Sequence, residues 1–202
     1  MQIWMAFIMR VCVKNNLRNH CLLTVLWVFC LFLSPTSYAD DYHARINNVK
    51  VSVVNDYYLV SAHFTYQLSP EALEALQNGV PLFWTIRIKA EQQVFFLANT
   101  LIEHNIHYQL RYHALLNMYR VNNEETGETF NFSQLANALA SISHIKALPV
   151  IAQHAVSTPA TTTIKIKILF NLDALPLPLR PFAHLNHQWS LSSNWTSWPL
   201  TK

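Results

Sequence analysis

The alternating run at residues 164–172, followed by Leu-Pro-Leu-Pro-Leu-Arg, constrains the fold more than any other part of the sequence. Its apolar and polar side chains fall on opposite sides of an extended chain, which is the two-residue period of a strand with one face in water. The apolar set is Ile164, Ile166, Ile168, Phe170 and Leu172, and the polar set is Lys165, Lys167, Asn171 and Asp173. Pro176 and Pro178 donate no N–H group, so the chain must leave the sheet there. The apolar face requires a second layer to cover it.

The same period recurs along the chain and predicts an antiparallel β protein. The predicted strands are residues 45–54, 58–68, 82–90, 107–113 and 189–195, with weaker patterns at 93–101, 115–121 and 149–156. Two short helices are expected, one that Ser69 caps and Gly79 ends, and one that Ser133 caps. Because strands and helices do not alternate regularly, we predict a two-layer, immunoglobulin-like β-sandwich. The alternative is an α+β domain whose helices cover one face of an antiparallel sheet.

Residues 1–39 have the features of a signal peptide. An apolar run at residues 21–33 is shorter than the roughly 20 residues of a membrane span. The basic residues that precede it are Arg10, Lys14 and Arg18. Small residues at Ser37 and Ala39 occupy the positions that a signal peptidase reads, so we predict cleavage after Ala39 and a single periplasmic domain at residues 40–202. An uncleaved anchor is the alternative, as is a start at Met9.

Removal of this leader changes the composition of the chain. The three cysteines all lie within it, at positions 12, 21 and 30, so we expect no disulfide in the exported domain. Three of the 14 Lys and Arg residues leave with it, and the remaining 11 balance the 11 Asp and Glu residues. A near-neutral domain without a basic cluster argues against nucleic acid as a partner. We expect contact with a membrane only through the leader, if the leader is retained.

The sequence contains few of the patterns that enzymes require. Gly79 and Gly127 are the two glycines of the chain, and they cannot form a glycine-rich phosphate loop or a G-x-S-x-G nucleophile elbow. The acids that could orient a histidine or pair for glycoside chemistry are Asp56, Glu103, Asp173, Asp40-Asp41 and Glu124-Glu125. No Ser-His-Asp set is indicated by spacing. We therefore predict no catalytic residues, with a histidine-centred envelope enzyme as the alternative.

Histidines and tryptophans are the remaining candidates for a site. The histidines with metal-ligand spacing are the pairs His104/His107 and His184/His187, with His113 and His154 as candidate third ligands. Residues i and i+3 need not converge on an extended chain, so we predict no metal and no other cofactor. The tryptophans that could line a groove are Trp84, Trp189, Trp195 and Trp198. Most are expected to fill the core, and Trp198 is expected to be the most exposed.

Four ordered segments resemble a bacterial family of exported proteins. They are Asn78-Gly79-Val80-Pro81-Leu82; Leu110-Arg111-Tyr112-His113-Ala114-Leu115 with Tyr119 and Val121; Phe132-x-x-Leu135 with Ala138-Leu139; and Leu175-Pro176-x-Pro178-Leu179-Arg180. Over most of residues 44–200 the chain is similar to the family catalogued as domain of unknown function 4390. The resemblance implies an exported proteobacterial protein, often encoded near a two-component sensor kinase, and implies no catalytic residue. The chain departs from the family at residues 92–97, where a segment richer in Arg and Trp is expected.

Nine residues carry this resemblance, and no role is assigned to them: Gly79, Pro81, Leu110, Tyr112, His113, Tyr119, Pro176, Pro178 and Arg180. We expect a non-enzymatic binding or accessory module for a protein or another envelope component, linked to envelope sensing. A histidine-centred enzyme is the rival class, and a carrier of an apolar ligand is a third. A buried carboxylate beside His113 or His187 would favour the enzyme. A long uncovered edge strand would favour docking by strand addition.

Export can be tested by the N-terminus of the processed protein. We expect a C-terminally tagged chain to be recovered outside the cytoplasm with Asp40 as its first residue, because the leader carries the basic, apolar and small-residue features of a signal peptide. N-terminal sequencing checks this. Recovery of exported protein that begins at Met1 or Met9 would indicate a retained anchor instead.

Overall fold

The computed structural model describes residues 42–200, which lie within one compact unit of the chain. The predicted leader and its cleavage site lie outside the described residues. The strands of the described part are β1 (Ala44–Val54), β2 (Tyr57–Tyr66), β3 (Leu82–Val94), β4 (Leu97–His113), β5 (Met118–Asn123), β6 (Thr129–Phe132), β7 (His144–Ala152), β8 (Thr162–Phe170) and β9 (Thr196–Pro199). Its α-helices are α2 (Pro70–Gln77), α3 (Leu135–Ile142) and α4 (Arg180–Leu185). Within residues 42–200, no helix has both the length and the hydropathy needed to cross a bilayer.

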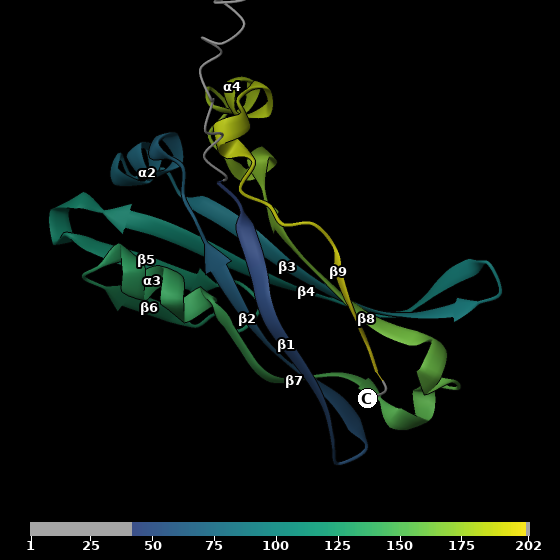
Figure 1. The fold of residues 1–202 in the computed structure, drawn as a ribbon. Helices are drawn as coiled ribbons and strands as arrows, with labels where there is room; N and C mark the ends of the chain where they lie inside the picture. Colours follow the sequence, from purple (N-terminus) through teal and green to yellow (C-terminus); the bar gives the residue numbers. More distant parts are fainter. Residues whose placement is uncertain (1–41, 201–202) are drawn as a thin grey trace, which may run out of the picture. The chain divides into compact units, whose positions relative to one another are not determined.

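The strands form two antiparallel sheets (Figure 1). One has three strands in the order β1-β2-β7, and the other has six in the order β6-β5-β4-β3-β8-β9. Apolar side chains from both sheets form one core. Tyr66 of β2 and Trp84 of β3 meet across the layers, with ring centroids 5.5 Å apart. The predicted two-layer antiparallel sandwich is confirmed, with three short helices in the described residues where two were expected.

The side chains of the central strands lie on the faces that the alternating sequence pattern predicted. Ile164, Ile166 and Ile168 of β8 are fully buried, whereas Lys165 and Lys167 point to the other face. This strand lies between β3 and β9, and pairs with β3 along its length. On β2 the five alternating positions from Tyr58 to Tyr66 are likewise buried. The two-residue period therefore identified the apolar face of each sheet, and these two faces pack together in the core.

Ser69 and Gly79 perform the predicted roles at the ends of α2, and short polar residues form the turn between β1 and β2. Asn55 and Asp56 connect β1 to β2 with φ values of 49° and 61°, the backbone of a type I′ turn, which short polar residues tolerate. The Ser69 hydroxyl accepts a hydrogen bond of 3.1 Å from the N–H of Ala72 and caps α2. Gly79 follows this helix with a φ of 82°, where a side chain would cause strain.

Two predicted strands contain turns instead. Within residues 93–101, Phe95 and Phe96 form the two-residue turn between β3 and β4. This turn was missed because Phe-Phe is not a turn sequence. Within residues 115–121, a 3₁₀ turn at Ala114–Leu116 and a left-handed Asn117 precede β5. The strand begins only at Met118 because these residues reverse the chain.

Two predictions around α3 and β7 are also corrected. Ser133 does not cap α3; the N-cap is Gln134, and its side chain makes no capping bond. The predicted strand at residues 149–156 is displaced, because β7 begins earlier and a 3₁₀ turn at Gln153–Ala155 follows it. The alternation of β7 was hidden by Ala147, which has a φ of 47° and coincides with irregular pairing to β2.

The predicted closing strand at residues 189–195 is wrong, since the last strand is β9. The hydroxyls of Ser192 and Ser193 instead accept hydrogen bonds from the N–H groups of Phe170 (2.9 Å) and Ile168 (2.8 Å). This segment satisfies donors of β8 with side chains before β9 pairs with the strand. The chain does leave the sheet after β8 as predicted, but it then forms α4, which was not predicted.

The assignment of faces on β8 can be tested by a matched pair of substitutions. We expect Ile166→Asp to prevent folding, because it buries an unpaired charge in the core. Lys167→Asp should change the free energy of unfolding by about 1 kcal/mol or less, since the side chain lies on the polar face. Urea unfolding monitored by circular dichroism checks both. Similar damage from the two changes would contradict the assigned faces.

Candidate functional site

The two histidine pairs do not form metal sites in the structure. His104 and His107 lie on opposite faces of β4, as an odd spacing in a strand requires. His104 Nε2 is 3.0 Å from the carbonyl oxygen of Val150, and His107 Nδ1 is 2.9 Å from the Thr85 hydroxyl. In the part of the chain that the structure describes, no group of three or more His, Cys, Asp or Glu side chains could hold a metal ion. Independence from metal stays a prediction.

The acidic candidates are distributed over the molecule. Glu103 Oε1 and Oε2 lie 3.1 Å from Arg87 Nε and 3.2 Å from Lys89 Nζ. The hydrogen bond from Lys89 is the main cause that lowers the pKa of Glu103. Asp173 pairs with His184 at 3.4 Å on exposed side chains. Both carboxylates thus have their partners near the surface, and the charged residues beside His113 are arginines.

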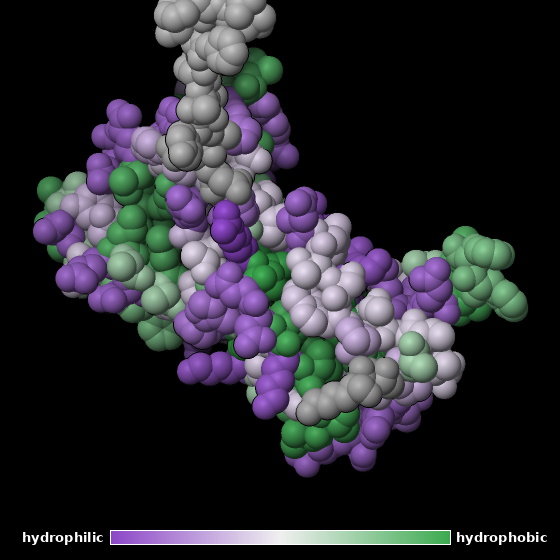
Figure 2. All heavy atoms as spheres, viewed as in Figure 1, coloured by the Kyte–Doolittle hydropathy of each residue, from purple (hydrophilic) through white to green (hydrophobic). Residues whose placement is uncertain are grey.

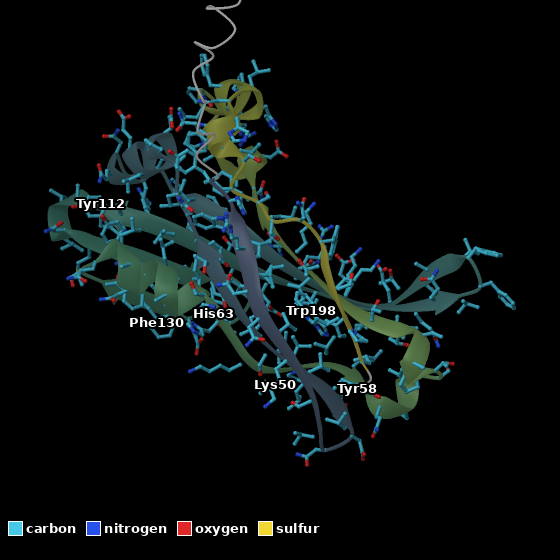
Figure 3. All side chains as sticks on the ribbon, viewed as in Figure 1. Lys50, Tyr58, His63, Tyr112, Phe130 and Trp198 are labelled. Atoms are coloured by element: carbon cyan, nitrogen blue, oxygen red, sulfur yellow. The ribbon has the colours of Figure 1, made fainter. Side chains whose placement is uncertain are left out.

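The structure brings together most of the residues that carry the family resemblance. Leu110 pairs with Leu82, the residue after Pro81, and Tyr112 pairs with Tyr119 across β4 and β5. The two tyrosine rings lie 4.8 Å apart, and a Cβ atom at Gly79 would lie 3.8 Å from the Tyr112 carbonyl oxygen. The Tyr112 hydroxyl donates a 2.6 Å hydrogen bond to Asn117. These contacts shape the β4–β5 end of the sheet (Figure 3).

The remaining motif residues lie in the segment that leads into α4. Arg180 Nε donates a hydrogen bond of 2.7 Å to the carbonyl oxygen of Leu175, a fully buried residue. Pro176 and Pro178 lie between these two partners in the sequence. The Leu-Pro-x-Pro-Leu-Arg motif therefore closes a local loop by a hydrogen bond from the Arg180 side chain to its own backbone. Both groups of motif residues have structural contacts that explain them.

His113 is the motif residue with a perturbed titration. It lies at the end of β4, two residues after Arg111 and opposite Met118 of β5. Arg111 pairs directly with Arg120 of β5. Burial of the imidazole is the main cause that lowers the pKa of His113, followed by repulsion from Arg120 and Arg111. This environment holds the ring neutral and disfavours the imidazolium form. No carboxylate is among the causes of this shift, unlike a histidine that a carboxylate orients in a catalytic triad.

Tryptophan exposure differs from the prediction. Trp84 and Trp189 are buried in the core, and Trp198 is partly buried against it. Trp195 is the most exposed of the four, with 40% of its surface accessible to solvent. The expectation that Trp198 would be the most exposed is therefore wrong. Lys89 Nζ and Lys167 Nζ lie 5.4 Å and 6.0 Å from the Trp195 ring centroid. The indole therefore packs over basic side chains on the polar face of the larger sheet.

The structure places an open sheet edge at β1. This strand has 11 residues and forms the outer edge of the three-stranded sheet. One irregularity interrupts its pairing with β2, between Ile46 and Asn48, and residues 48–54 then continue in regular register. Among the strands described, only β2 pairs with it. Its Asn-Val-Lys-Val-Ser-Val-Val sequence contains no proline and one charge, Lys50 (Figure 3).

The other sheet edges of the described chain have features that hinder strand addition. β6 and β9 have four residues each, and β9 ends in Pro199. β7 contains Pro149, the left-handed Ala147 and two irregularities in its pairing. The carbonyl oxygen of Val150 on this strand is already in contact with His104 Nε2. Short strands, proline and bulges are among the usual protections of sheet edges; residues 48–54 of β1 have none of these three, and Lys50 is the one charged residue there.

Incomplete burial distinguishes β1 from its neighbour. Val49 and Val51 pair with Ala62 and Val60 of β2, which are buried, yet both valines are only partly buried. Val53, on the same face, is 47% exposed. Apolar side chains are visible at the surface between β1 and β9 in the space-filling view (Figure 2). An added strand would cover this half-buried row.

The outer face beside this edge also contains a pair of histidines that the sequence did not predict. His63 and His144 pair directly between β2 and β7, with ring centroids 4.6 Å apart. Asn47 Nδ2 lies 3.1 Å from His63 Nδ1 and 2.5 Å from the Thr65 hydroxyl. Only strand pairing brings these rings together. The pair could have been predicted from the position of His63 on the polar face of its strand, if the register of β7 had been known.

The fold and its open edge define a two-layer antiparallel β protein with one long edge strand, β1, that only β2 pairs with among the described strands. The chain belongs to the family described as Domain of unknown function (DUF4390), whose model matches residues 42–199. The resemblance noted in the sequence is therefore confirmed. Comparisons with curated proteins and with solved structures found no match.

The environment of His113 predicts a specific dependence of stability on pH. Its pKa is lowered in the folded state, so the unfolded chain takes up the proton first as the pH falls through about 6.5. Wild-type stability should therefore decrease in acid relative to His113→Gln, which lacks this titration. Melting temperatures of both proteins between pH 7.5 and pH 5.5 check this. A constant difference across the range would contradict the environment described.

Proposed function

We propose that this protein is a non-enzymatic docking module that receives an extended segment of a partner protein along residues 48–54 of β1. The single observation that supports the proposal is the long open edge of β1. Strand addition supplies main-chain hydrogen bonds from the unpaired N–H and C=O groups of such an edge, and alternate side chains provide the specificity.

The half-buried valines favour this mode of binding over contact with a flat face. Val49, Val51 and Val53 lie on the side of β1 that faces the core, and an added strand would place its own alternate side chains beside them. Each square ångström of apolar surface removed from water contributes roughly 25 cal/mol. The partner segment is therefore expected to alternate apolar and polar residues, with its apolar side toward β9.

We propose further that the module acts after export, in the periplasm, as an accessory to envelope sensing. The leader features of residues 1–39 and the family resemblance support this setting. The ion pairs of Glu103 and Asp173 lie on the surface, and His113 has basic neighbours. The Asp173–His184 contact is exposed on both side chains and His113 has no carboxylate beside it, so we propose docking and not catalysis.

Two neighbouring valines provide a matched test. Val53 and Val54 are 47% and 48% exposed but point to opposite faces of β1. We expect Val53→Lys to reduce capture of envelope proteins about tenfold or more, because an inward-pointing charge at the edge opposes strand addition. Val54→Lys should capture the same proteins as the wild type. Quantitative pull-down from envelope extract, with melting temperatures as a folding control, checks both.

The binding mode can be measured separately from the affinity. In the free protein, the amides of residues 48–54 that point away from β2 should exchange rapidly with solvent. They should become protected when a captured partner is added, because they then donate to the added strand. Protection elsewhere with unchanged exchange in β1, or equal loss of capture in both lysine variants, would contradict docking at this edge.

A further inference from the structure

The hairpin of β3 and β4 ends in a group of exposed apolar side chains. Phe95 is 91% exposed, Phe96 is 99% exposed and Leu97 is 77% exposed. Val94, the register partner of Leu97, is also exposed. We refer to residues 94–97 as the hairpin tip. In Figure 1 it extends to the right of the sheets, and the same region is green in Figure 2.

Strand pairing shows why the tip stands free. The pairing of β3 with β8 ends at Gln92, and the pairing of β4 with β5 begins only at Tyr108. Residues 93–98 therefore pair only with each other. A contiguous apolar group on a surface usually marks an interaction site. Here the group is a convex knob that is open on every side.

The backbone of this turn disfavours phenylalanine, so turn formation does not explain why Phe95 and Phe96 occupy it. Phe95 has a φ of 56°, and Phe96 does not have a positive φ. A positive φ at the first central residue is the type II′ pattern, in which glycine is preferred, and a bulky residue is strained in this region. The β1–β2 turn of the same chain uses Asn55 and Asp56. Strain retained at such a position is typical of functional sites.

The charge pattern around the tip points to its environment. Residues 92–102 contain no charged side chain, and Glu91 and Glu103 flank them. From Phe95 to Glu91 the extended chain covers ~13 Å at about 3.3 Å per residue. Amphipathic segments at a lipid interface bury their apolar side by roughly 5–10 Å. The tip can therefore reach that depth without removing a charge from water.

The sheet face behind the tip is basic. Glu91 pairs with Lys165 at 2.7 Å, and Glu103 pairs with both Arg87 and Lys89. Lys167 extends the basic character of this face beside Trp195. Two acids therefore face four cations on adjacent strands. This surplus would attract anionic head groups when this face lies within a Debye length of the bilayer.

We propose that the hairpin tip inserts Phe95 and Phe96 into the surface of a lipid bilayer that contains anionic head groups. Fluid lipid can surround a knob that is exposed on all sides, whereas a protein interface normally offers an apolar centre with a polar rim. The polar, uncharged and exposed Gln93 and Asn99 would then lie at head-group level. This contact is separate from the β1 edge, and it goes beyond the sequence expectation, which allowed membrane contact only through a retained leader.

A reporter beside the tip tests the proposal in the full chain. The three native cysteines are replaced by serine, and Ala98→Cys carries an environment-sensitive NBD label. A matched chain carries the label at Glu125→Cys in the β5–β6 turn. On addition of vesicles of phosphatidylethanolamine and phosphatidylglycerol, emission at residue 98 should increase and shift to shorter wavelength. Emission at residue 125 should not change, even if the leader holds the chain on the vesicle.

The decisive variant is Phe95→Gly with Phe96→Asn in the chain labelled at residue 98. It removes both apolar side chains and supplies the glycine that the turn prefers, so its melting temperature should equal or exceed that of the wild type. The vesicle concentration for half of the emission change should increase on the order of 100-fold, because two phenylalanine side chains no longer enter lipid. The double variant would thus lose lipid contact without losing stability.

Three results would overturn the proposal. They are an absent response at residue 98, an unchanged response in the double variant, and an equal response at residue 125. Concentration-dependent self-association that the double variant abolishes, without any vesicle response, would assign the tip to a second copy of the chain. Capture of a partner protein that requires Phe95 and Phe96, again without a vesicle response, would assign it to a protein pocket.

Discussion

The structure depends on the burial of one large apolar face, the inner face of the six-stranded sheet. β3 and β8 present fully buried side chains at alternate positions of this face, and neither strand could leave them in water. A chain of aromatic contacts runs along it from Tyr66 through Trp84 and Phe170 to Trp189, with centroid distances of 5.5 Å, 5.3 Å and 6.0 Å. The opposing sheet, the helices and the closing segment are all ways of covering that face.

Coverage by a narrower layer explains the open edge. Three strands oppose six, so the second layer ends at β1 before the larger sheet does, and the chain uses α3 and the segment around Trp189 to cover other parts of the core. The valines of β1 are consequently only half buried. The same mismatch that leaves β1 incomplete also makes it a suitable acceptor for an additional strand. Docking at this edge would complete the smaller layer.

The hairpin tip arises from a different mismatch, between strand lengths. β3 and β4 have 13 and 17 residues, whereas β8 has nine, so the end of their hairpin extends beyond its neighbour. A hairpin without a neighbour has no core to bury apolar side chains in, yet this one ends in two phenylalanines. Edge and tip are thus separate surfaces with separate chemistry, and different partners are proposed for them, a peptide strand and lipid.

The sequence by itself determined the faces of the central strands, the cap at Ser69 and the helix end at Gly79, because each depends on a local period or on the backbone preference of one residue. It could not determine which strands pair. The turn at Phe95 and Phe96 was missed because its residues violate turn preference, and the closing strand was misplaced because Ser192 and Ser193 bond to β8 through their side chains. The open edge of β1, the meeting of His63 with His144 and the separation of His104 from His107 are consequences of strand order and register. These contacts form between residues distant in sequence, so only the tertiary structure decides them.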